Sequence, residues 1–369
     1  MNRMKLGEIL SVKHGWAFKG EYFAEDGEQS ILTPGNFFEK GGFKPNNGKE
    51  RYYTGTYPKE YLCHKGDLIV AMTQQAEGLL GSTALVPEND KYLHNQRIGL
   101  ITCDEKRLNK LFAYYLFMTK SVREQLERSS SGTKVKHTSP EKIYDVEVEI
   151  PDVISQQKIA NLLWSVDEKI ANNKAINDNL SAMAYDIYMH TFFSKKPNAK
   201  LKDILTEAEK SAIQVGEAKT SNGEYPFFTS GATILKWNEP FVDGRNCFLN
   251  TGGNADVKFY VGKAAYSTDT WSISAKSEMS DYLYLMLFSI KPELDQKFFQ
   301  GTGLKHLQKP LLKDRPIYIP EKMELEGFNR QVMPMFDIIS ENTRENQQLT
   351  SLRDWLLPML MNGQATISD

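Results

Sequence analysis

A long helical pattern occurs twice in this chain, and it limits the folds available to everything around it. The first copy begins after Pro151 and runs to about Phe193, with apolar residues alternating at spacings of three and four. Such spacing is typical of a coiled-coil seam rather than of a helix half-buried on a globular core. The second copy occupies about residues 321–361. Equivalent positions differ in number by 169 in the pairs Ile170/Ile339, Asn173/Asn342, Asn177/Asn346 and Leu180/Leu349.

The repeat continues upstream of both helical patterns with the same offset. The matching pairs are Gly132-Thr133 with Gly301-Thr302, Lys136-His137 with Lys305-His306, and Ile150-Pro151 with Ile319-Pro320. Near the two starts, residues 5–10 resemble residues 200–205. A period this long indicates a duplicated domain rather than a solenoid of short repeats.

The composition narrows the class of protein. A chain of 369 residues with 40% hydrophobic residues is long enough for two or three domains with real cores. With a net charge of −2, the chain has no strong overall electrostatic attraction for nucleic acid. This disfavours a stand-alone DNA-binding protein but permits a subunit whose partners supply the cationic surface. Three cysteines without metal-ligand spacing predict no zinc site and fit a reducing cytoplasm. No run of 18 apolar residues occurs, so we expect no membrane insertion.

The patterns divide the chain into two globular parts and two helices. We place the globular parts at residues 1–150 and 196–319, and the long helices at 151–195 and 320–369. Short strand patterns bounded by turn residues, together with a few shorter helical patterns, give the globular parts a mixed α/β (α+β) character. We predict strands at 67–72, 83–86, 97–102, 145–150, 246–249, 257–260, 264–266 and 316–319, and helices at 109–127 and 281–289.

Two helices of about forty residues, or roughly 60 Å each, require a packing partner, and each copy can serve the other. An antiparallel pairing in which facing residue numbers add up to 519 aligns both apolar seams and predicts a pseudo-twofold axis. In this register Asn173 faces Asn346 and Asn177 faces Asn342. A layer of buried amides fixes register, because any slip sets an amide against an apolar side chain. The alternative is that these asparagines lie at a wet edge. The predicted seam residues are Leu163, Ile170, Asn173, Asn177, Leu180, Ile187, Val332, Ile339, Asn342, Asn346, Leu349 and Leu356.

Several segments resemble the specificity (S) subunits of type I restriction-modification systems. The closing segment Leu349–Gly363 is similar to the C-terminal helix of that family. The resemblance extends over essentially the whole chain through further segments: Ile150-Pro151 with Gln156-Gln157, Val166–Ile170, Lys65–Ile69, Gly132–His137, Pro226–Gly231 and Gly301–His306. It implies two target recognition domains, related by the pseudo-twofold axis and separated by an antiparallel pair of long coiled-coil helices.

The resemblance also implies a function and a set of partners. Each globular part would read one half of a split sequence in double-stranded DNA. The helix pair would set the spacer between the halves and dock two methyltransferase (modification) subunits, and through them the restriction and motor subunits. S-adenosylmethionine, ATP and Mg²⁺ would be held by those partners, so this chain would need no cofactor or metal and perform no catalysis. The alternatives are a specificity subunit of a type II-like system with fused methylation and cleavage, or a coiled-coil adaptor without DNA readout.

A free-standing enzyme is disfavoured because the motifs for its chemistry are incomplete. An adenine methyltransferase holds the flipped base with an Asn/Asp-Pro-Pro-aromatic motif, and the nearest match, Asn238-Glu239-Pro240-Phe241, lacks the first proline. The stretch from Gly15 to Gly20 is followed by Glu21, so no phosphate-binding Lys-Ser/Thr completes a phosphate-binding loop. The six histidines show no metal-ligand spacing.

Polar and basic side chains in loops are the candidates for DNA contact. In the first domain these are Lys19, Thr73, Gln74, Gln75, Arg97, Lys134, Lys136 and His137. In the second domain they are Thr229, Ser230, Asn254, Lys258, Thr302, Lys305 and His306. Gln suits adenine and Arg suits guanine. The Lys-His pairs occur in both copies, so we expect their lysines to contact phosphate, with base readout left to residues that differ. Gly132-Thr133 and Gly301-Thr302 are interpreted as turn formers, and Trp16 as a core residue in preference to a DNA-facing one.

Overall fold

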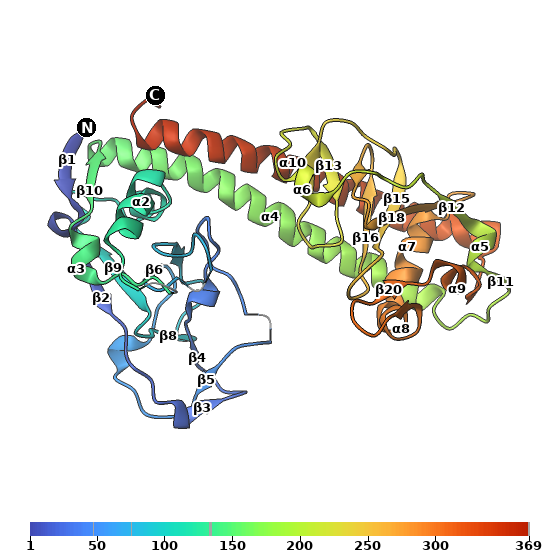
Figure 1. Ribbon diagram of the computed structural model, residues 1–369, viewed down its shortest axis with the longest axis horizontal. Helices are drawn as coiled ribbons and strands as arrows, with labels where there is room; N and C mark the ends of the chain where they lie inside the picture. The colour runs from blue at the N-terminus through green and yellow to red at the C-terminus, as the bar shows by residue number, and fades with distance from the viewer. Residues whose placement is uncertain (47, 75, 133–134, 368–369) are drawn as a thin grey trace. The chain divides into compact units, whose positions relative to one another are not determined.

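The structure is a computed structural model of the 369-residue chain, and it describes every residue except 47, 75, 133–134 and 368–369. The chain forms two compact units (Figure 1). Unit 1 consists of residues 1–168 and 350–369, and unit 2 of residues 169–349. The long helices α4 (Val153–Thr191) and α10 (Lys322–Met361) contribute to both units.

Unit 1 contains a four-stranded antiparallel sheet, a smaller sheet and a terminal strand pair. The four-stranded sheet has the order β2 (Leu10–His14), β9 (Ile98–Cys103), β6 (Leu68–Ala71) and β7 (Thr83–Leu85). The smaller sheet has the order β3 (Phe23–Ala24), β5 (Tyr52–Tyr53), β4 (Ser30–Ile31) and β8 (Tyr92–Leu93), with β4 and β8 parallel. The terminal pair joins β1 (Asn2–Lys5) to β10 (Glu147–Ile150).

Unit 2 repeats this strand order with different loops, except that its smaller sheet has no counterpart of β3 among the described residues. Its four-stranded sheet has the order β12 (Leu205–Glu207), β18 (Thr270–Ala275), β15 (Arg245–Asn250) and β16 (Val257–Val261). Its smaller sheet has the order β14 (Leu235–Trp237), β13 (Tyr225–Phe228) and β17 (Ala265–Tyr266), with β13 and β17 parallel. Two further pairs join β11 (Ala199–Lys200) to β21 (Pro316–Ile317), and β19 (Phe299–Gln300) to β20 (His306–Leu307). The repeated order supports the duplication inferred from the sequence.

Shorter helices connect the strands. They are α1 (Lys110–Leu116), α2 (Lys120–Ser129), α3 (Pro140–Tyr144), α5 (Leu201–Ile204), α6 (Val215–Ala218), α7 (Ser280–Ser289), α8 (Lys291–Glu293) and α9 (Lys309–Lys313). Single helical turns are η1 (Leu6–Glu8), η2 (Gly20–Tyr22), η3 (Pro34–Asn36), η4 (Lys59–Tyr61) and η5 (Leu294–Phe298).

One predicted helix is wrong in its continuity. The expected helix over 109–127 is divided into α1 and α2 by a break at residues 117–119. Thr119 causes the second start, because its hydroxyl accepts a hydrogen bond from the Val122 N–H and donates one to the Leu116 carbonyl. A threonine that caps the N-terminus of a helix satisfies an otherwise unpaired N–H, which apolar periodicity does not reveal.

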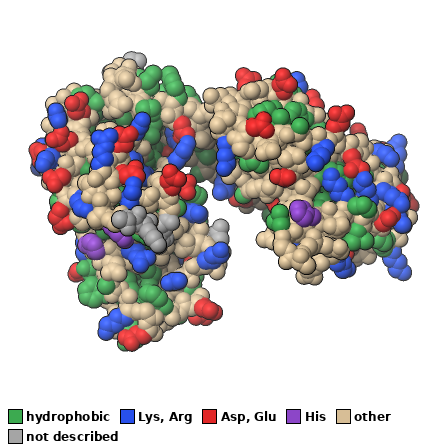
Figure 2. Space-filling view, in the orientation of Figure 1, with side chains coloured by type: hydrophobic (Ala, Val, Ile, Leu, Met, Phe, Trp, Pro, Cys, Tyr) green, Lys and Arg blue, Asp and Glu red, His purple; other side chains and the backbone are tan. Residues whose placement is uncertain are grey.

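The surface carries charges of both signs. Figure 2 shows Lys and Arg side chains lying among Asp and Glu side chains over the displayed face of each unit. This mixture agrees with the near-zero net charge of the chain. Any attraction to DNA therefore depends on local clusters rather than on a field of one sign.

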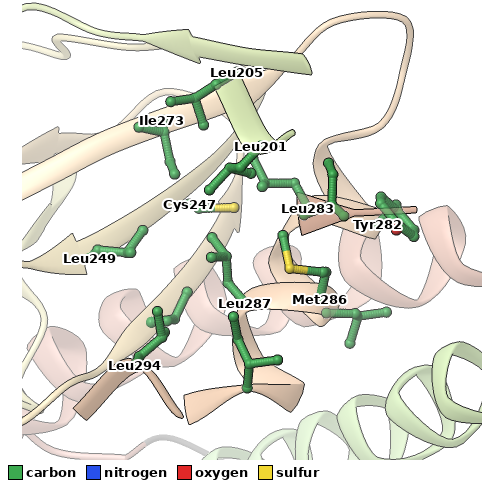
Figure 3. Close-up of a cluster of buried hydrophobic side chains, with 14 of the residues drawn as sticks. Leu201, Leu205, Cys247, Leu249, Ile273, Tyr282, Leu283, Met286, Leu287 and Leu294 are labelled. Atoms are coloured by element: carbon green, nitrogen blue, oxygen red, sulfur yellow. The ribbon is translucent and has the colours of Figure 1, made fainter. Parts of the chain in front are cut away.

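Each unit has its own apolar core. In unit 2, Leu249 and Ile273 of the four-stranded sheet pack against Leu283, Met286 and Leu287 of α7 (Figure 3). Burying one such side chain stabilises a fold by roughly 1.5–3 kcal/mol. In unit 1 the corresponding core joins the sheet to α1 and to the beginning of α4, including Leu163 and, partly buried, Leu356 of α10.

The long helices begin and end at recognisable caps. At the start of α4, Oδ1 of Asp152 accepts a hydrogen bond of 3.0 Å from the Ser155 N–H. At the end of α10, Gly363 adopts a left-handed conformation with φ of 68°. Both devices satisfy backbone groups that a helix terminus leaves unpaired. The bounds of α4 and α10 agree to within two residues with the helical patterns predicted after Pro151 to about 193 and at about 321–361, whereas the segments assigned to the long helices, 151–195 and 320–369, extend beyond the helix ends.

Within unit 2 the two long helices pair antiparallel through an asparagine layer. Nδ2 of Asn173 donates to Oδ1 of Asn346 at 3.0 Å, and Nδ2 of Asn342 donates to Oδ1 of Asn177 at 2.8 Å. These are the pairs expected from the sequence register. Asn173 is 1% exposed and the other three asparagines are partly buried, so this layer does not lie at a wet edge.

The asparagine layer also shows local pseudo-twofold symmetry. Asn177 donates to the Ile339 carbonyl at 3.3 Å, and Asn346 donates to the Ile170 carbonyl at 3.4 Å. Adding 169 to each α4 residue, and subtracting it from each α10 residue, converts one of these bonds into the other. The same operation interchanges the two Asn–Asn bonds, so the duplicated sequence has produced a symmetric helix pairing here.

We expect Asn173→Ala to lower the free energy of unfolding by about 1–3 kcal/mol, because it removes the hydrogen bond that Asn173 donates to Oδ1 of Asn346 in the seam. Urea-induced unfolding of the purified chain measures the effect. The matched control is Asn179→Ala on the exposed face of the same helix, which makes the same change in helix propensity. Equal destabilisation by the two variants would contradict the assigned role of the asparagine layer.

Candidate nucleic-acid interface

Three strands of the unit 1 sheet expose their connecting segments at one edge. Because β2 and β6 end there and β9 begins there, the segments around Trp16, Thr73 and Arg97 lie next to one another. Backbone hydrogen bonds join them. The Met72 N–H donates to the Arg97 carbonyl at 3.0 Å, and the Gln96 N–H donates to the Trp16 carbonyl at 3.1 Å.

The segment after α2 completes this edge. The Gln74 N–H donates to the Lys136 carbonyl at 2.9 Å, and the Thr73 hydroxyl lies 3.1 Å from Nδ1 of His137. The fold thus brings together five predicted DNA-binding residues that are distant in sequence. We call the following set the unit 1 edge: Trp16, Thr73, Gln74, Gln96, Arg97, Lys136 and His137.

Other predicted residues of unit 1 lie apart from this set or cannot be described. Lys19 is exposed at the start of η2, where its carbonyl accepts a hydrogen bond of 3.2 Å from the Tyr22 N–H. Gln75 and Lys134 lie outside the described residues.

Unit 2 forms an edge with the same backbone connections. The Thr251 N–H donates to the Asp269 carbonyl at 2.9 Å, and the Gly253 N–H donates to the Lys305 carbonyl at 2.9 Å. His306 forms a β-bridge with the segment after β15, as His137 does with the segment after β6. We call the following set the unit 2 edge: Ile213, Gly252, Gly253, Thr268, Asp269, Lys305 and His306.

Some of the predicted DNA-binding residues of unit 2 have side chains that are hydrogen-bonded within the protein, and others have side chains exposed to solvent. Thr229 is buried, and its hydroxyl accepts a hydrogen bond of 3.1 Å from the Gly231 N–H. Lys258 donates to the Thr229 carbonyl at 2.9 Å and pairs with Asp256 at 3.2 Å. These two side chains thus stabilise the loop itself. Asn254 and Thr302 are exposed, and Ser230 is half-buried.

The two repeated lysines have equivalent acidic partners. Nζ of Lys136 forms an ion pair with Glu127 at the end of α2, and Nζ of Lys305 pairs with Asp295 at 2.9 Å. These pairs are substantially solvent-exposed, and exposed pairs contribute only about 0–1 kcal/mol. Each lysine can therefore exchange its carboxylate for a phosphate at small cost, although the acidic neighbour reduces the positive charge presented to DNA.

Gly132 and Gly301 are needed for the turns before these lysines. Both have positive φ, 99° and 150° respectively. A Cβ atom at Gly132 would lie 2.1 Å from the Val135 carbonyl oxygen, and one at Gly301 would lie 2.6 Å from the Leu304 carbonyl oxygen. Their role as turn formers in both copies follows from this close backbone approach.

The interpretation of Trp16 as a core residue is wrong. Its side chain is 41% exposed, and its ring lies across Tyr61 with the ring centroids 5.4 Å apart. The backbone of Trp16 is fixed by hydrogen bonds to residues 94 and 96, while β2 has already ended at His14. The ring therefore covers Tyr61 from outside instead of entering the core, and it is available as a stacking surface.

The described residues contain neither a metal-binding cluster nor a membrane-spanning helix. No group of three His, Cys, Asp or Glu side chains in this part of the chain lies close enough to hold a metal ion. Over the same residues, no helix is both long and apolar enough to cross a membrane.

Comparison with known proteins identifies the family. A family model described as the type I restriction modification DNA specificity domain matches residues 1–182 and again residues 195–351. The chain therefore belongs to the family of type I restriction-modification DNA specificity domains, and it contains two copies of that domain.

Individual relatives are distant but cover most of the chain. The specificity subunit of the type I restriction enzyme MjaIX from Methanocaldococcus jannaschii is 22% identical over 301 residues, which span 70% of this chain and 69% of the relative. The specificity subunit of the type I restriction enzyme HindI from Haemophilus influenzae is 21% identical, spanning 81% of this chain and 86% of the relative. The crystal structure of the type I restriction-modification S subunit from M. genitalium shares the fold, with a TM-score of 0.66, 15% identity and coverage of 100% of this chain and 96% of that one.

The sequence alone missed the unit 2 counterparts Ile213, Thr268 and Asp269. The offset of 169 holds for the helices and the Lys-His segments, whereas Arg97 and Asp269 differ by 172, and Met72 and Thr251 by 179. Loop insertions of unequal length thus obscure the repeat upstream. The pattern of backbone hydrogen bonds, which needs coordinates, reveals the equivalence.

We expect His94, which supports the unit 1 edge, to make unit 1 sensitive to acid. Its ring is fully buried, and burial lowers the pKa of His94 to about 4. Between pH 6.5 and 4 the unfolded chain binds a proton that the folded chain does not, so the His94 contribution is lost as pH falls through this window. Over the whole window, the free energy of unfolding falls by about 3 kcal/mol. Urea unfolding at pH 7 and pH 5 measures the loss, which should be smaller in His94→Gln. The control for the substitution itself is His64→Gln, at an exposed position of the same unit.

Proposed function

We propose that this chain is the subunit that selects the DNA sequence in a type I restriction-modification complex, with each unit reading one half of a bipartite target. The observation that carries the proposal is the pair of edges. The two units hold equivalent loops with the same backbone hydrogen bonds, yet they present different side chains. A shared scaffold with different polar groups is what reading two different half-sites requires, because base edges are distinguished by donor and acceptor patterns.

The helix pair would set the separation between the two half-sites. Each long helix is continuous through residues of both units, and the asparagine layer fixes the register of one helix against the other. The length of the DNA between the half-sites would then depend on the length of the helices, which increases by 1.5 Å per residue. This role depends on the pairing rather than on any catalytic group.

We propose that two methyltransferase subunits dock on the long helices, and that restriction and motor subunits are reached through them. Both helices leave large apolar side chains in contact with solvent. Beyond the first turn of each helix, the most exposed ones are Ile176, Met183, Ile338, Leu352 and Trp355, with exposed fractions between 42% and 58%. Exposed apolar groups concentrated on a helix pair are typical of a protein-protein contact.

The chemistry would belong to the partners. S-adenosylmethionine, ATP and Mg²⁺ would bind to them, and the present chain would work in the cytoplasm without a cofactor and without catalysis. The incomplete methyltransferase motif Asn238-Glu239-Pro240-Phe241 supports this division of labour. A type II-like complex with fused activities would use the same two edges, whereas a simple adaptor has no need for two polar edges that differ.

Mapping of methylated adenine tests the proposal directly. Cells carrying the chain and its neighbouring methyltransferase should show a split motif of two short halves, and cells lacking only this chain should lose it. Replacing residues 1–150 with the equivalent part of another family member should change one half and leave the other intact. Methylation that is indifferent to removal of the chain would contradict the specificity role and favour the adaptor.

Lengthening the helix pair should lengthen the spacer. Inserting four residues after Asn177 and four immediately before Asn342, which faces it, adds about one turn, or 5.4 Å, to each helix. DNA rises about 3.4 Å per base pair, so the mapped gap should grow by one or two base pairs. Insertion in one helix alone is the control, and it should abolish methylation because the apolar seam beyond the insertion loses its register while the asparagine layer keeps it. An unchanged gap in the double insertion would refute the spacer role.

A further inference from the structure

We infer that Arg97 and Asp269 are equivalent specificity positions that read opposite partners of a G·C base pair. Arg97 donates to guanine in one half-site, and Asp269 accepts from the amino group of cytosine in the other. This inference rests on the proposed function and extends it to the chemistry of individual bases. Asp269 was not among the residues predicted from the sequence.

The equivalence of the two positions follows from backbone hydrogen bonds. The Arg97 carbonyl accepts from the N–H of the residue that follows β6, at 3.0 Å, and the Asp269 carbonyl accepts from the Thr251 N–H after β15, at 2.9 Å. The preceding residues are also equivalent, because the Gln96 N–H donates to the Trp16 carbonyl and the Thr268 N–H donates to the Ile213 carbonyl.

The returning Lys-His segment gives an independent check of the alignment. The residues following the two histidines, Thr138 and Leu307, donate to the carbonyls of Met72 and Thr251 at 2.9 and 3.0 Å. These acceptors are the same two residues whose N–H groups bond to Arg97 and Asp269. Both sides of each edge therefore assign Arg97 and Asp269 to one structural position.

Both side chains are free to act on a ligand. Each is exposed, and neither forms an ion pair within the described part of the chain. Their backbones are nevertheless fixed: the Asn95 side chain accepts from the Arg97 N–H at 3.2 Å, and the Thr251 hydroxyl donates to the Asp269 carbonyl at 3.1 Å. A fixed backbone under a free polar side chain suits base recognition, because little ordering of the chain remains to be done on binding.

The two side chains have opposite hydrogen-bonding capacity. A guanidinium only donates, and its two parallel N–H groups match O6 and N7 of guanine in the major groove. An ionised carboxylate only accepts, and it matches the N4 amino group of cytosine. The structural position is thus the same in the two units, whereas the group it recognises is reversed.

The negative charge of Asp269 also determines what it can contact. Phosphates repel a carboxylate, so an exposed aspartate on a DNA-facing edge can contribute favourably only at a base amino group. The neighbouring lysines of both edges are positively charged and occur in both copies, which fits contacts with phosphate that carry no sequence information. Specificity and attachment are thereby assigned to different residues of one edge.

Binding of the assembled complex to modified DNA tests the inference at the level of single atoms. The probes are duplexes with 7-deazaguanine, which lacks N7, in one half-site, or with a cytosine analogue lacking the 4-amino group in the other. We expect each substitution to weaken wild-type binding by roughly 5- to 100-fold. The 7-deazaguanine penalty should disappear in Arg97→Ala, and the cytosine-analogue penalty should disappear in Asp269→Ala.

Methylation mapping gives the second readout in cells. Arg97→Ala should relax one G·C position in one half-site, and Asp269→Asn should admit adenine at one position of the other, because an amide matches adenine N6 and N7. The unaltered half of each motif reports that the variant chain is folded and assembled. Matched controls are Arg3→Ala, on the terminal strand pair of unit 1, and Glu224→Gln, on an exposed loop of unit 2.

The possible outcomes separate this inference from the function on which it rests. If wild-type cells show a split motif that requires the chain, but both variants keep that motif unchanged, the inference is wrong and the specificity function stands. A uniform loss of affinity in Arg97→Ala, with a salt dependence reduced by about one charge, would instead make Arg97 a phosphate contact and overturn its assignment. No split motif in wild-type cells would remove the proposed function itself.

Discussion

The asparagine layer is the constraint on which the arrangement of the long helices depends. Apolar seams alone tolerate sliding by one helical turn, since leucine and isoleucine pack acceptably against many neighbours. Four amides that bond to one another and to the carbonyls of Ile170 and Ile339 do not, because a slip would leave each amide against an apolar side chain. An unpaired buried amide costs about 1–3 kcal/mol. A shifted register would incur this cost at more than one amide, so the native register is strongly favoured.

The symmetry of the asparagine layer does not extend to the contacts that the helices make inside each unit. In unit 1, Arg353 of α10 pairs with Asp167 of α4 at 2.7 Å, and the Tyr115 hydroxyl donates to the same aspartate at 2.6 Å. The counterparts of Arg353 and Asp167 in the repeat are Ala184 and Phe336, which are both buried in the unit 2 core. A partly buried ion pair in unit 1 and two buried apolar residues in unit 2 thus occupy equivalent places. The shared seam preserves the pairing of the helices, while each globular part is attached by its own interactions.

Sequence reasoning succeeded where the physical signal is periodic and long. The two helices and the Asn173–Asn346 and Asn177–Asn342 pairs follow from spacing and duplication. It failed for β3, β4 and β8, which are two residues long and are formed by pairing with distant segments rather than by local preference. The prediction that Trp16 is a core residue was wrong because an aromatic residue near a strand is usually buried, whereas its actual exposure depends on where the strand ends. Asp269 was hidden because its equivalence to Arg97 lies in hydrogen bonds between segments that insertions have displaced in sequence.

The distribution of charge bears on what this chain contributes to DNA binding. Affinity that is independent of sequence comes largely from lysine and arginine at phosphates. Here the net charge is −2, and the two lysines repeated at the edges are each paired with a carboxylate. Such a chain is poorly suited to hold DNA alone. It is well suited to discriminate once cationic partners supply attachment, because weak intrinsic attraction keeps binding to unrelated sequences low and leaves the difference between half-sites to a few exposed donors and acceptors such as Arg97 and Asp269.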